Sequence, residues 1–412
     1  MSAQGSCRHC AAPLSRSFCD LGLSPLANNY LTREQLARGE MFFPLHAFVC
    51  EKCLLVQLLE FETPANIFGD YAYFSSYSTS WLEHARLYTE EMISRFKLDS
   101  SSSVIELASN DGYLLQYFAK KGIPVLGIEP AANVAKVAVE KGIPSLVRFF
   151  GTETAAALVK EGRRPDLLLG NNVLAHVPDL NDFVKGMKMV LAPNGLITME
   201  FPHLLRLMAD NQFDTIYHEH FSYFSFLTVV RVFGAHGLRL FDVQQLPTHG
   251  GSLRIFATHA ENQTHQVTPA VAALLETERA AGLESMSTYA DFSERVRKTK
   301  RGLLKFLIEA KEQGKKIVGY GAPAKGNTLL NFCGVGPDII EYTVDRSPHK
   351  QDHFLPGSRL PIFHPDKVRE TKPDYLFILP WNLEAEIKQQ MAHIREWGGR
   401  FVVPIPEVKI VS

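Results

Sequence analysis

Two stretches of the chain each have the pattern of a strand, a polar loop and a helix, and they limit the folds open to it. In the first, VIEL (104–107) is a short apolar run, ASNDG (108–112) a turn and YLLQYFAKK (113–121) a helix, with another strand at VLGIEP. In the second, KKIVGYGAPAKGNTLLNF (315–332) repeats this order, and strands follow at EYTVDRSP and DYLFILPWN. Strands that alternate with helices favour a parallel, doubly wound sheet. The sequence therefore predicts an α/β protein with two nucleotide-fold-like units.

The length and composition predict further division of the chain. With 412 residues it is too long for one ordinary hydrophobic core. The first seventy or so residues are poor in helix signals and hold five of the six cysteines, and Val267 to Gly314 has the composition of a helical connector. We expect three parts, over residues 1–72, 73–300 and 301–412.

The charge balance argues against several kinds of partner. The chain has 43 basic and 44 acidic residues, so no global field points to nucleic acid or to an anionic membrane surface. The N-terminus lacks the basic-then-apolar pattern of a signal peptide, and no apolar run is long enough to span a bilayer. We expect a cytoplasmic protein that binds neither nucleic acid nor membrane.

Four cysteines form two C-x-x-C pairs, Cys7 with Cys10 and Cys50 with Cys53. In a reducing compartment such pairs more often bind metal than form disulfides. Four thiolates are the number that a closed tetrahedral zinc site needs, whereas a catalytic zinc keeps one position open and usually includes histidine. The spacing predicts a structural Zn²⁺ site in the N-terminal module.

The first polar loop has features of a nucleotide site. Glu106 ends a strand and Gly112 opens a helix, whose N-terminus favours negative charge. Glu129 follows at the end of the next strand, where a carboxylate suits a ribose diol. Because Ala108 and Asn110 replace the glycines of G-x-G-x-x-G, the loop suits S-adenosylmethionine better than the pyrophosphate of NAD.

More polar residues follow at the predicted carboxyl edge of the sheet, where α/β proteins bind ligands. Any one of them is as readily explained as a loop-capping residue. Asn110 and Asp111 are candidates for the amino-acid end of S-adenosylmethionine. The predicted cofactor-binding residues are Glu106, Asn110, Asp111, Gly112, Glu129, Asn171, Asn172 and His176.

Six motifs, in order along nearly the whole chain, resemble those of the S-adenosylmethionine-dependent sugar C-methyltransferases of deoxysugar biosynthesis. They are the paired C-x-x-C, YAYFSSYSTSW, ELASNDGYLL, DTIYHEHFSYFS, HGGSLR and GYGAPAKGNTLLN. The resemblance implies a zinc-binding N-terminal module, a class I methyltransferase Rossmann-like middle domain that binds S-adenosylmethionine, and a smaller Rossmann-like C-terminal domain that helps hold the substrate. That substrate would be a nucleotide-linked 4-keto-6-deoxyhexose, as a dTDP- or other NDP-sugar.

Methylation of a sugar carbon requires a base for the C-3 proton, which the C-4 ketone acidifies, and donors near the developing oxyanion. The resemblance implies that His220 is the base and that Tyr73, Tyr217 and Glu219 lie at further active-site positions. In a strand, Tyr217 and Glu219 would face away from His220, so a shared site requires a turn or an irregular loop. For His218 a structural hydrogen bond is the more economical explanation. A metal role is weaker still, because H-E-H is not the H-E-x-x-H zinc pattern.

Two later loops resemble substrate contacts. In THGGSLR, glycines let the backbone approach a ligand, although a bulged strand entry explains the pattern as well. In GYGAPAKGNTLL, free amides and a lysine suit a diphosphate, although the charged residues that follow also fit a solvated loop. The predicted substrate-binding residues are His249, Ser252, Arg254, Tyr320, Gly321, Lys325, Asn327, Arg346, Lys350 and His353.

Two other functions remain open from the sequence. An NAD-linked nucleotide-sugar oxidoreductase is supported by the C-terminal glycines and by Asp345, which ends the next strand where dinucleotide domains carry their ribose acid. A non-catalytic relative that only binds a sugar nucleotide is the second, and the dense polar set in YHEH argues against it.

Overall fold

The computed structural model describes residues 5–63 and 74–411. The chain forms two compact units, each made of several segments. The first comprises Met1–Ser15, Cys50–Leu204 and Phe221–Glu284, and the second comprises Arg16–Val49, Leu205–His220 and Ser285–Ser412. The YHEH segment therefore groups with the C-terminal part of the chain, although the segment Phe221–Glu284 of the first unit separates the two in the sequence.

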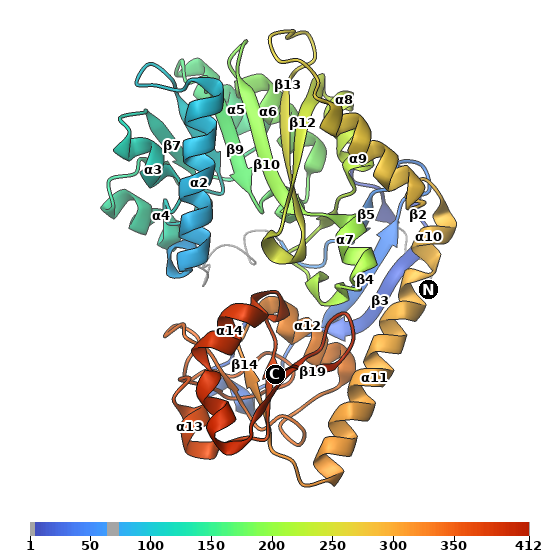
Figure 1. The fold of residues 1–412 in the computed structure, drawn as a ribbon. Coiled ribbons are helices and arrows are strands. Elements are labelled where there is room, and N and C mark those ends of the chain that lie inside the picture. The colour runs from blue at the N-terminus through green and yellow to red at the C-terminus, as the bar shows by residue number, and fades with distance from the viewer. Residues whose placement is uncertain (1–4, 64–73, 412) are drawn as a thin grey trace. The chain divides into compact units, whose positions relative to one another are not determined.

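The first unit contains a seven-stranded sheet in the order β12-β13-β10-β9-β6-β7-β8 (Figure 1). The five neighbouring strands β10, β9, β6, β7 and β8 are all parallel to one another. Strand β13 runs antiparallel to both of its neighbours, β10 and β12. The strands are β6 Val104–Leu107, β7 Val125–Ile128, β8 Ser145–Leu146, β9 Leu167–Asn171, β10 Leu196–Pro202, β12 Leu238–Leu246 and β13 Ser252–His259. The predicted parallel sheet is confirmed, with an antiparallel pair added at one edge.

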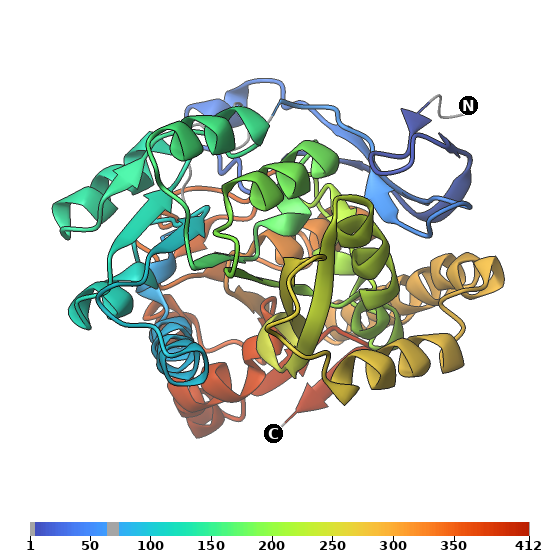
Figure 2. The same cartoon turned by 90° about the horizontal axis from the view of Figure 1, so that it is seen from above.

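Helices cover both faces of this sheet (Figure 2). They are α2 Thr79–Phe96, α3 Leu115–Lys120, α4 Ala132–Glu140, α5 Thr152–Lys160, α6 Leu180–Val190, α8 Phe226–Ala235 and α9 Pro269–Ala280. Every residue of β6 and β9 is buried, because a strand covered on both faces has no solvent side. The polar residues at the ends of these strands are thereby held in a rigid frame.

The second unit is built on a six-stranded sheet in the order β16-β15-β14-β17-β18-β19, parallel except for β19. The strands are β14 Ile317–Tyr320, β15 Thr343–Val344, β16 Ile362–Phe363, β17 Tyr375–Ile378, β18 Arg400–Val403 and β19 Lys409–Val411. The helices are α10 Met286–Ala290, α11 Phe292–Glu312, α12 Ala324–Cys333, α13 Lys367–Thr371 and α14 Glu384–Gln390. The second predicted α/β unit is therefore confirmed.

Short strands complete each unit. In the first, β1 Gly5–Ser6 pairs with β2 Pro13–Leu14, and β5 Val56–Leu58 pairs with β11 Ser222–Tyr223. In the second, β3 Arg16–Ser24 and β4 Phe43–Val49 form an antiparallel pair. The remaining helix, α7 Leu204–Ala209, follows β10. Among the helices of the described residues, none has the length and apolar composition that a membrane span requires.

A buried carboxylate joins α8 and α9 beside the antiparallel strands (Figure 1). Glu278 of α9 accepts hydrogen bonds of 2.7 Å from the amides of both Phe226 and Leu227, the first two residues of α8. Its Oε1 also lies 2.6 Å from Nε2 of His203, which follows β10. Glu278 and His203 are each 1% exposed. One side chain thus satisfies a helix N-terminus and a buried histidine together.

We predict that Glu278→Ala destabilises the protein by about 3–5 kcal/mol, because it leaves two amides and an imidazole buried without their acceptor. Urea denaturation measures the free energy of unfolding. The control Glu276→Ala changes an exposed carboxylate on the same helix, and we expect an effect within about 0.5 kcal/mol. Equal effects of the two variants would contradict the buried role.

Candidate active site

The four paired cysteines lie together in the first unit. Their sulfur atoms all lie within 4.8 Å of one another, and Cys7–Cys53 and Cys10–Cys50 approach to 3.5 Å. A zinc ion with bonds of about 2.3 Å to four sulfurs requires S–S separations of just under 4 Å. Gln57 donates to the Cys7 sulfur at 3.2 Å, which suits a thiolate. The donor set and its geometry fit a closed structural zinc site.

In the loop after β6, three residues have positive φ angles, although only one of them is glycine. Ala108 and Asn110 have φ values of 53° and 49°, and Gly112 has 75°. A Cβ atom on Gly112 would also lie 3.1 Å from Ile143. Non-glycine residues in this left-handed region are uncommon and cluster at functional sites, where surrounding contacts hold them. Asn110 is held in this way, because its amide donates to Glu129 and its Oδ1 accepts from the Ser75 amide, both at 2.9 Å.

A cavity of about 500 Å³ opens beside this loop in the first unit. Five of the eight predicted cofactor residues line it: Asn110, Glu129, Asn171, Asn172 and His176. Trp81 and Phe149 add aromatic wall, which the sequence analysis did not single out. Among the described residues, no protein partner lies within hydrogen-bonding reach of either side-chain polar atom of buried Asn171. Buried polar groups are normally paired, so the cavity is suited to a polar ligand with an aromatic part.

The other three predicted cofactor residues do not line the cavity. Gly112 acts through its backbone, and Asp111 forms an ion pair of 3.0 Å with Lys141. Glu106 is fully buried, and burial, followed by the charges of Glu129 and Asp111, raises its pKa well above the usual value.

Two titratable residues that line the cavity, Glu129 and His176, have pKa values shifted by burial. Glu129 accepts from the amides of Ala131 and Asn110, each at 2.9 Å, which fixes its carboxylate, while burial raises its pKa. Burial lowers the pKa of His176 to about 4, so its imidazole is neutral near pH 7. The oriented carboxylate can accept further hydrogen bonds from a ribose diol.

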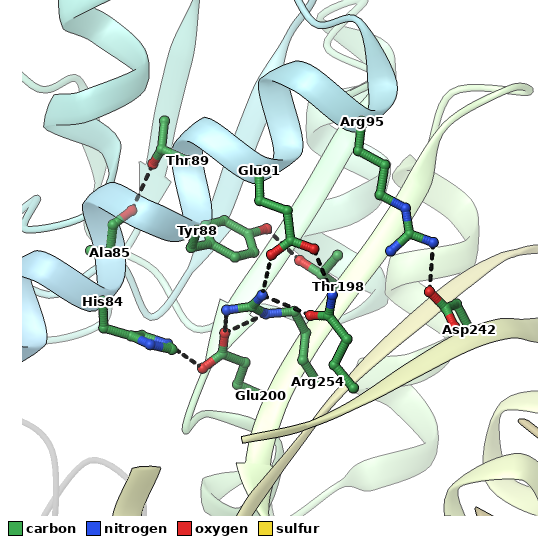
Figure 3. Close-up of polar contacts among 11 residues, drawn as sticks. His84, Ala85, Tyr88, Thr89, Glu91, Arg95, Thr198, Glu200, Asp242 and Arg254 are labelled. Carbon is green, nitrogen blue, oxygen red and sulfur yellow. Dashed lines mark hydrogen bonds and ion pairs between the residues drawn. The ribbon is translucent and has the colours of Figure 1, made fainter. Parts of the chain in front are cut away.

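Behind the cavity wall, a polar network ties α2 to β10 and β13 (Figure 3). Glu200 accepts from His84 at 2.8 Å and from Arg254 at 2.6 Å. Arg254 also donates to Glu91, as drawn in Figure 3, and to Gln244, each at 2.9 Å. The predicted substrate residue Arg254 is therefore 3% exposed and committed to protein partners.

The two other predicted residues of the THGGSLR loop differ in position. Ser252 donates to the Thr248 carbonyl at 3.0 Å and is buried. His249 has a φ of 56°, and its ring packs edge-on against Trp81 with centroids 5.0 Å apart. His249 thus adjoins a wall of the cavity, whereas Ser252 closes the loop.

In the second unit, the YHEH segment is a turn. The His220 amide donates to the Tyr217 carbonyl at 2.9 Å, so the segment is not a regular strand. Nδ1 of His220 lies 3.1 Å from the Thr215 carbonyl, which accepts its hydrogen, and Nε2 lies 2.9 Å from the Tyr217 hydroxyl. Because a carbonyl can only accept, Nδ1 of His220 carries a hydrogen, and Nε2 is the ring nitrogen that faces the Tyr217 hydroxyl.

The neighbours of His220 in the turn point to other partners. Glu219 is 4% exposed, and its Oε1 accepts from Nδ2 of Asn28 at 2.6 Å. Burial raises the pKa of Glu219 to about 7, against the lowering effects of Asn28 and of the Lys350 charge. His218 lies 3.2 Å from the Pro44 carbonyl through Nε2, and burial lowers its pKa. The structural hydrogen bond considered for His218 is therefore present.

A second carboxyl anchors the start of the turn. Asp214 is fully buried and accepts from the Trp381 indole at 2.6 Å. Burial raises its pKa to about 6, and the Lys325 charge opposes that rise. Lys325 donates to Asn382 at 2.8 Å and lies 4.5 Å from the centre of the Trp381 ring. The predicted diphosphate lysine is thus placed beside the turn's carboxyl group.

The loop between β14 and α12 has the predicted strand–loop–helix geometry. Gly321 has a φ of 88°, and a Cβ there would lie 2.5 Å from Pro380. Asp345 accepts from the amides of Ala322 at 2.7 Å and Ser347 at 2.8 Å, one with each carboxylate oxygen. Asp345 therefore caps this loop with both carboxylate oxygens, as Glu129 does in the first unit.

The remaining predicted substrate residues are scattered over the second unit. Tyr320 donates to Gln390 at 2.6 Å, and Asn327 donates to the Ala27 carbonyl at 2.6 Å. Arg346 lies 3.7 Å from Glu386 at the surface, and His353 lies 2.9 Å from the Gln351 carbonyl. Lys350 donates to the Ala322 carbonyl at 2.9 Å, and its charge lowers the pKa of Glu219 against the effect of burial. Tyr73 lies outside the described residues.

Family models match three consecutive parts of the chain. The "Putative zinc binding domain" matches residues 7–68, the "Methyltransferase domain" residues 81–243 and the "C-methyltransferase C-terminal domain" residues 247–406. The first covers all four paired cysteines and the second covers the cavity loop. The predicted cofactors, structural zinc and S-adenosylmethionine, are thereby confirmed.

Individual relatives differ in how much of the chain they share. The C-methyltransferase NovU of Streptomyces niveus is 39% identical over 409 residues, 98% of this chain and 96% of its own. A ubiquinone biosynthesis O-methyltransferase of Bartonella tribocorum is 30% identical over 95 residues, 23% of this chain and 38% of its own. A solved S-adenosylmethionine-dependent methyltransferase from Clostridium acetobutylicum covers 43% of this chain and 92% of its own, with 11% identity and a TM-score of 0.36.

We predict that the purified protein carries one zinc ion per chain and that Cys50→Ala releases it. Loss of one thiolate opens the tetrahedral site, and we expect the thermal midpoint to fall by about 5–10 °C. Elemental analysis and thermal denaturation are the measurements. Cys19→Ala, which removes a buried unpaired thiol, is the control and should keep the zinc. Full zinc content in Cys50→Ala would contradict the assignment.

We predict that Glu129→Ala weakens binding of S-adenosylhomocysteine by about 10–100-fold, because charged hydrogen bonds to the ribose are lost. Isothermal calorimetry measures the affinity. Glu140→Ala, at the exposed end of α4, is the control and should bind as the wild type does. NADH should give no binding heat, and tight NADH binding without binding of S-adenosylhomocysteine would reverse the cofactor assignment.

Proposed function

The chain belongs to the S-adenosylmethionine-dependent C-methyltransferases, and from that premise we propose that it methylates C-3 of a nucleotide-linked 4-keto-6-deoxyhexose through an enolate. S-adenosylmethionine, when bound, supplies an electrophilic methyl group. The residues of this chain must then remove the C-3 proton and stabilise the charge that develops on the C-4 oxygen. The observation that carries the proposal is the Tyr217–His220 pair, with its 2.9 Å separation.

In this proposal His220 is the base. Its Nδ1–H donates to the Thr215 carbonyl, so Nε2 is the nitrogen that accepts the C-3 proton, once the Tyr217 hydroxyl has turned from Nε2 to the C-4 oxygen of the bound sugar. Tyr217 is the donor for the C-4 oxygen. The C-3 hydrogen and the C-4 oxygen belong to neighbouring atoms of the sugar, so the base and the donor must also be neighbours. The hydrogen-bonded pair meets that requirement before substrate binds.

Glu219 has a different role in the proposal. Its bond goes to Asn28, while Thr215 and Tyr217 orient the imidazole. We assign the Glu219 carboxylate to a sugar hydroxyl, since an ionised carboxylate is a strong acceptor. A pKa of about 7 means that Glu219 is ionised in a growing fraction of molecules as the pH rises through neutrality.

The nucleotide part of the substrate is assigned to the second unit. The N-terminus of α12, which follows the glycine loop, favours anions, and Lys350 lies at the same loop through the Ala322 carbonyl. Lys350 also acts on Glu219, so phosphate and sugar contacts would share one region of the unit. We do not propose an oxidoreductase, because the family models and the NovU relative that match this chain are methyltransferases.

We predict that His220→Asn lowers kcat by about 10²–10⁴-fold, the usual contribution of a general base, and leaves the affinity for S-adenosylhomocysteine unchanged. Product mass analysis over a panel of 4-keto sugar nucleotides measures turnover. His218→Asn is the matched control, and it should retain activity within several-fold because His218 bonds to the Pro44 carbonyl. Full turnover by His220→Asn would eliminate the base assignment.

A further inference from the structure

Asn28 forms a hydrogen bond with the Glu219 carboxylate, although the two residues are 191 positions apart in the sequence. Asn28 lies in the second unit, in the segment between the two cysteine pairs, after β3. Its Nδ2 lies 2.6 Å from Oε1 of Glu219. A carboxylate can only accept, so this contact orients the Asn28 amide nitrogen toward it.

A second residue of the same segment fixes the other side of Asn28. The Tyr30 hydroxyl lies 3.3 Å from Oδ1 of Asn28 and donates to the Ala322 carbonyl at 2.6 Å. Lys350 donates to that same carbonyl, and its ammonium lies 5.4 Å from the centre of the Tyr30 ring. A short chain of contacts therefore runs from the glycine loop through Tyr30 and Asn28 to Glu219.

The hydrogen bond from Asn28 affects the ionisation of Glu219, because Glu219 is buried. The carboxyl group is buried, and an unpaired buried carboxylate is strongly disfavoured relative to its neutral form. Two groups oppose burial, the Asn28 hydrogen bond first and the Lys350 charge second. Among the described residues, the other titratable groups in this series of contacts are Tyr30 and Asp345. The Asp345 carboxylate already accepts hydrogen bonds from two backbone amides. Loss of Asn28 would therefore remove the larger of the two effects that keep Glu219 charged.

We infer that Asn28 is a positioning residue for methyl transfer, which orients the Glu219 carboxylate for a sugar hydroxyl through the hydrogen bond from its side-chain amide. This inference rests on the proposed role of Glu219 and adds a residue from the segment between the cysteine pairs to the catalytic arrangement. Asn28 acts through Glu219 and not on the reacting atoms. A residue that only packed its own loop would affect stability without affecting the protonation of Glu219.

Two substitutions and a neighbour test this role. Asn28→Ala removes the donor, and Asn28→Asp places a second carboxylate beside Glu219, so both should raise the pKa of Glu219, the second by more. Asn29→Ala changes an exposed asparagine in the same loop and is the control. Zinc content and affinity for S-adenosylhomocysteine should stay at wild-type values in all three, because neither site includes Asn28.

The first readout is the pH profile of kcat/KM for the sugar nucleotide. In Asn28→Ala we expect a loss of about fivefold at pH 7 that is recovered at higher pH, because the rising limb moves up by about one pH unit. Asn28→Asp should move the limb further, and Asn29→Ala should leave it in place. A uniform loss at every pH, or a profile that matches the wild type, would overturn the inference.

The second readout does not depend on turnover. Infrared spectra of protein labelled with ¹³C-glutamate contain the protonated-carboxyl band of Glu219, identified by its absence from Glu219→Gln. In Asn28→Ala this band should persist to higher pH than in the wild type, and an unchanged titration would refute the hold on Glu219. If the wild type methylates no ketosugar, the proposed function fails, while this titration still decides whether Asn28 keeps Glu219 ionised.

Discussion

The hydrogen bond from His220 Nδ1 to the Thr215 carbonyl is the contact on which the account of the second unit depends. It fixes the tautomer, and so decides which ring nitrogen can act as a base. That geometry persists only if the turn is rigid. Partners from distant segments hold it: Trp381 binds Asp214, Thr328 donates to the Ile216 carbonyl at 3.0 Å, and Asn28 binds Glu219. The turn's shape is therefore set by the whole unit rather than by its own sequence.

In the first unit, two carboxyl groups are buried at the ends of neighbouring strands. Glu106 and Glu129 both have raised pKa values, chiefly because of burial. A ligand that brings positive charge near them favours their ionised forms, and S-adenosylmethionine carries such a charge on its sulfur. The loop residues Ala108 and Asn110 have left-handed backbone angles, which cost conformational free energy in residues other than glycine. The hydrogen bonds of Asn110 help to offset that cost.

Local patterns predicted much of the fold and part of the site. The cysteine cluster and both α/β units follow from short-range rules of ligand number and periodicity. The partners of the predicted residues could not be foreseen, because Asn28 and Glu219 meet only through the tertiary fold. The partners of Arg254 could not be foreseen either. The glycine-rich loop before it suggested a ligand contact, whereas in the structure its guanidinium is hydrogen-bonded within a buried network.

The central claim is that the methyl group goes to carbon and replaces a proton removed at C-3. A 4-keto sugar nucleotide that carries deuterium at C-3 tests it directly, by mass and NMR analysis of the methylated product. C-methylation through an enolate must expel the deuterium, so the product should carry a new C–CH₃ group and no deuterium label. A methylated product that retains deuterium at C-3 would show transfer to another position, such as an oxygen, and would contradict the account.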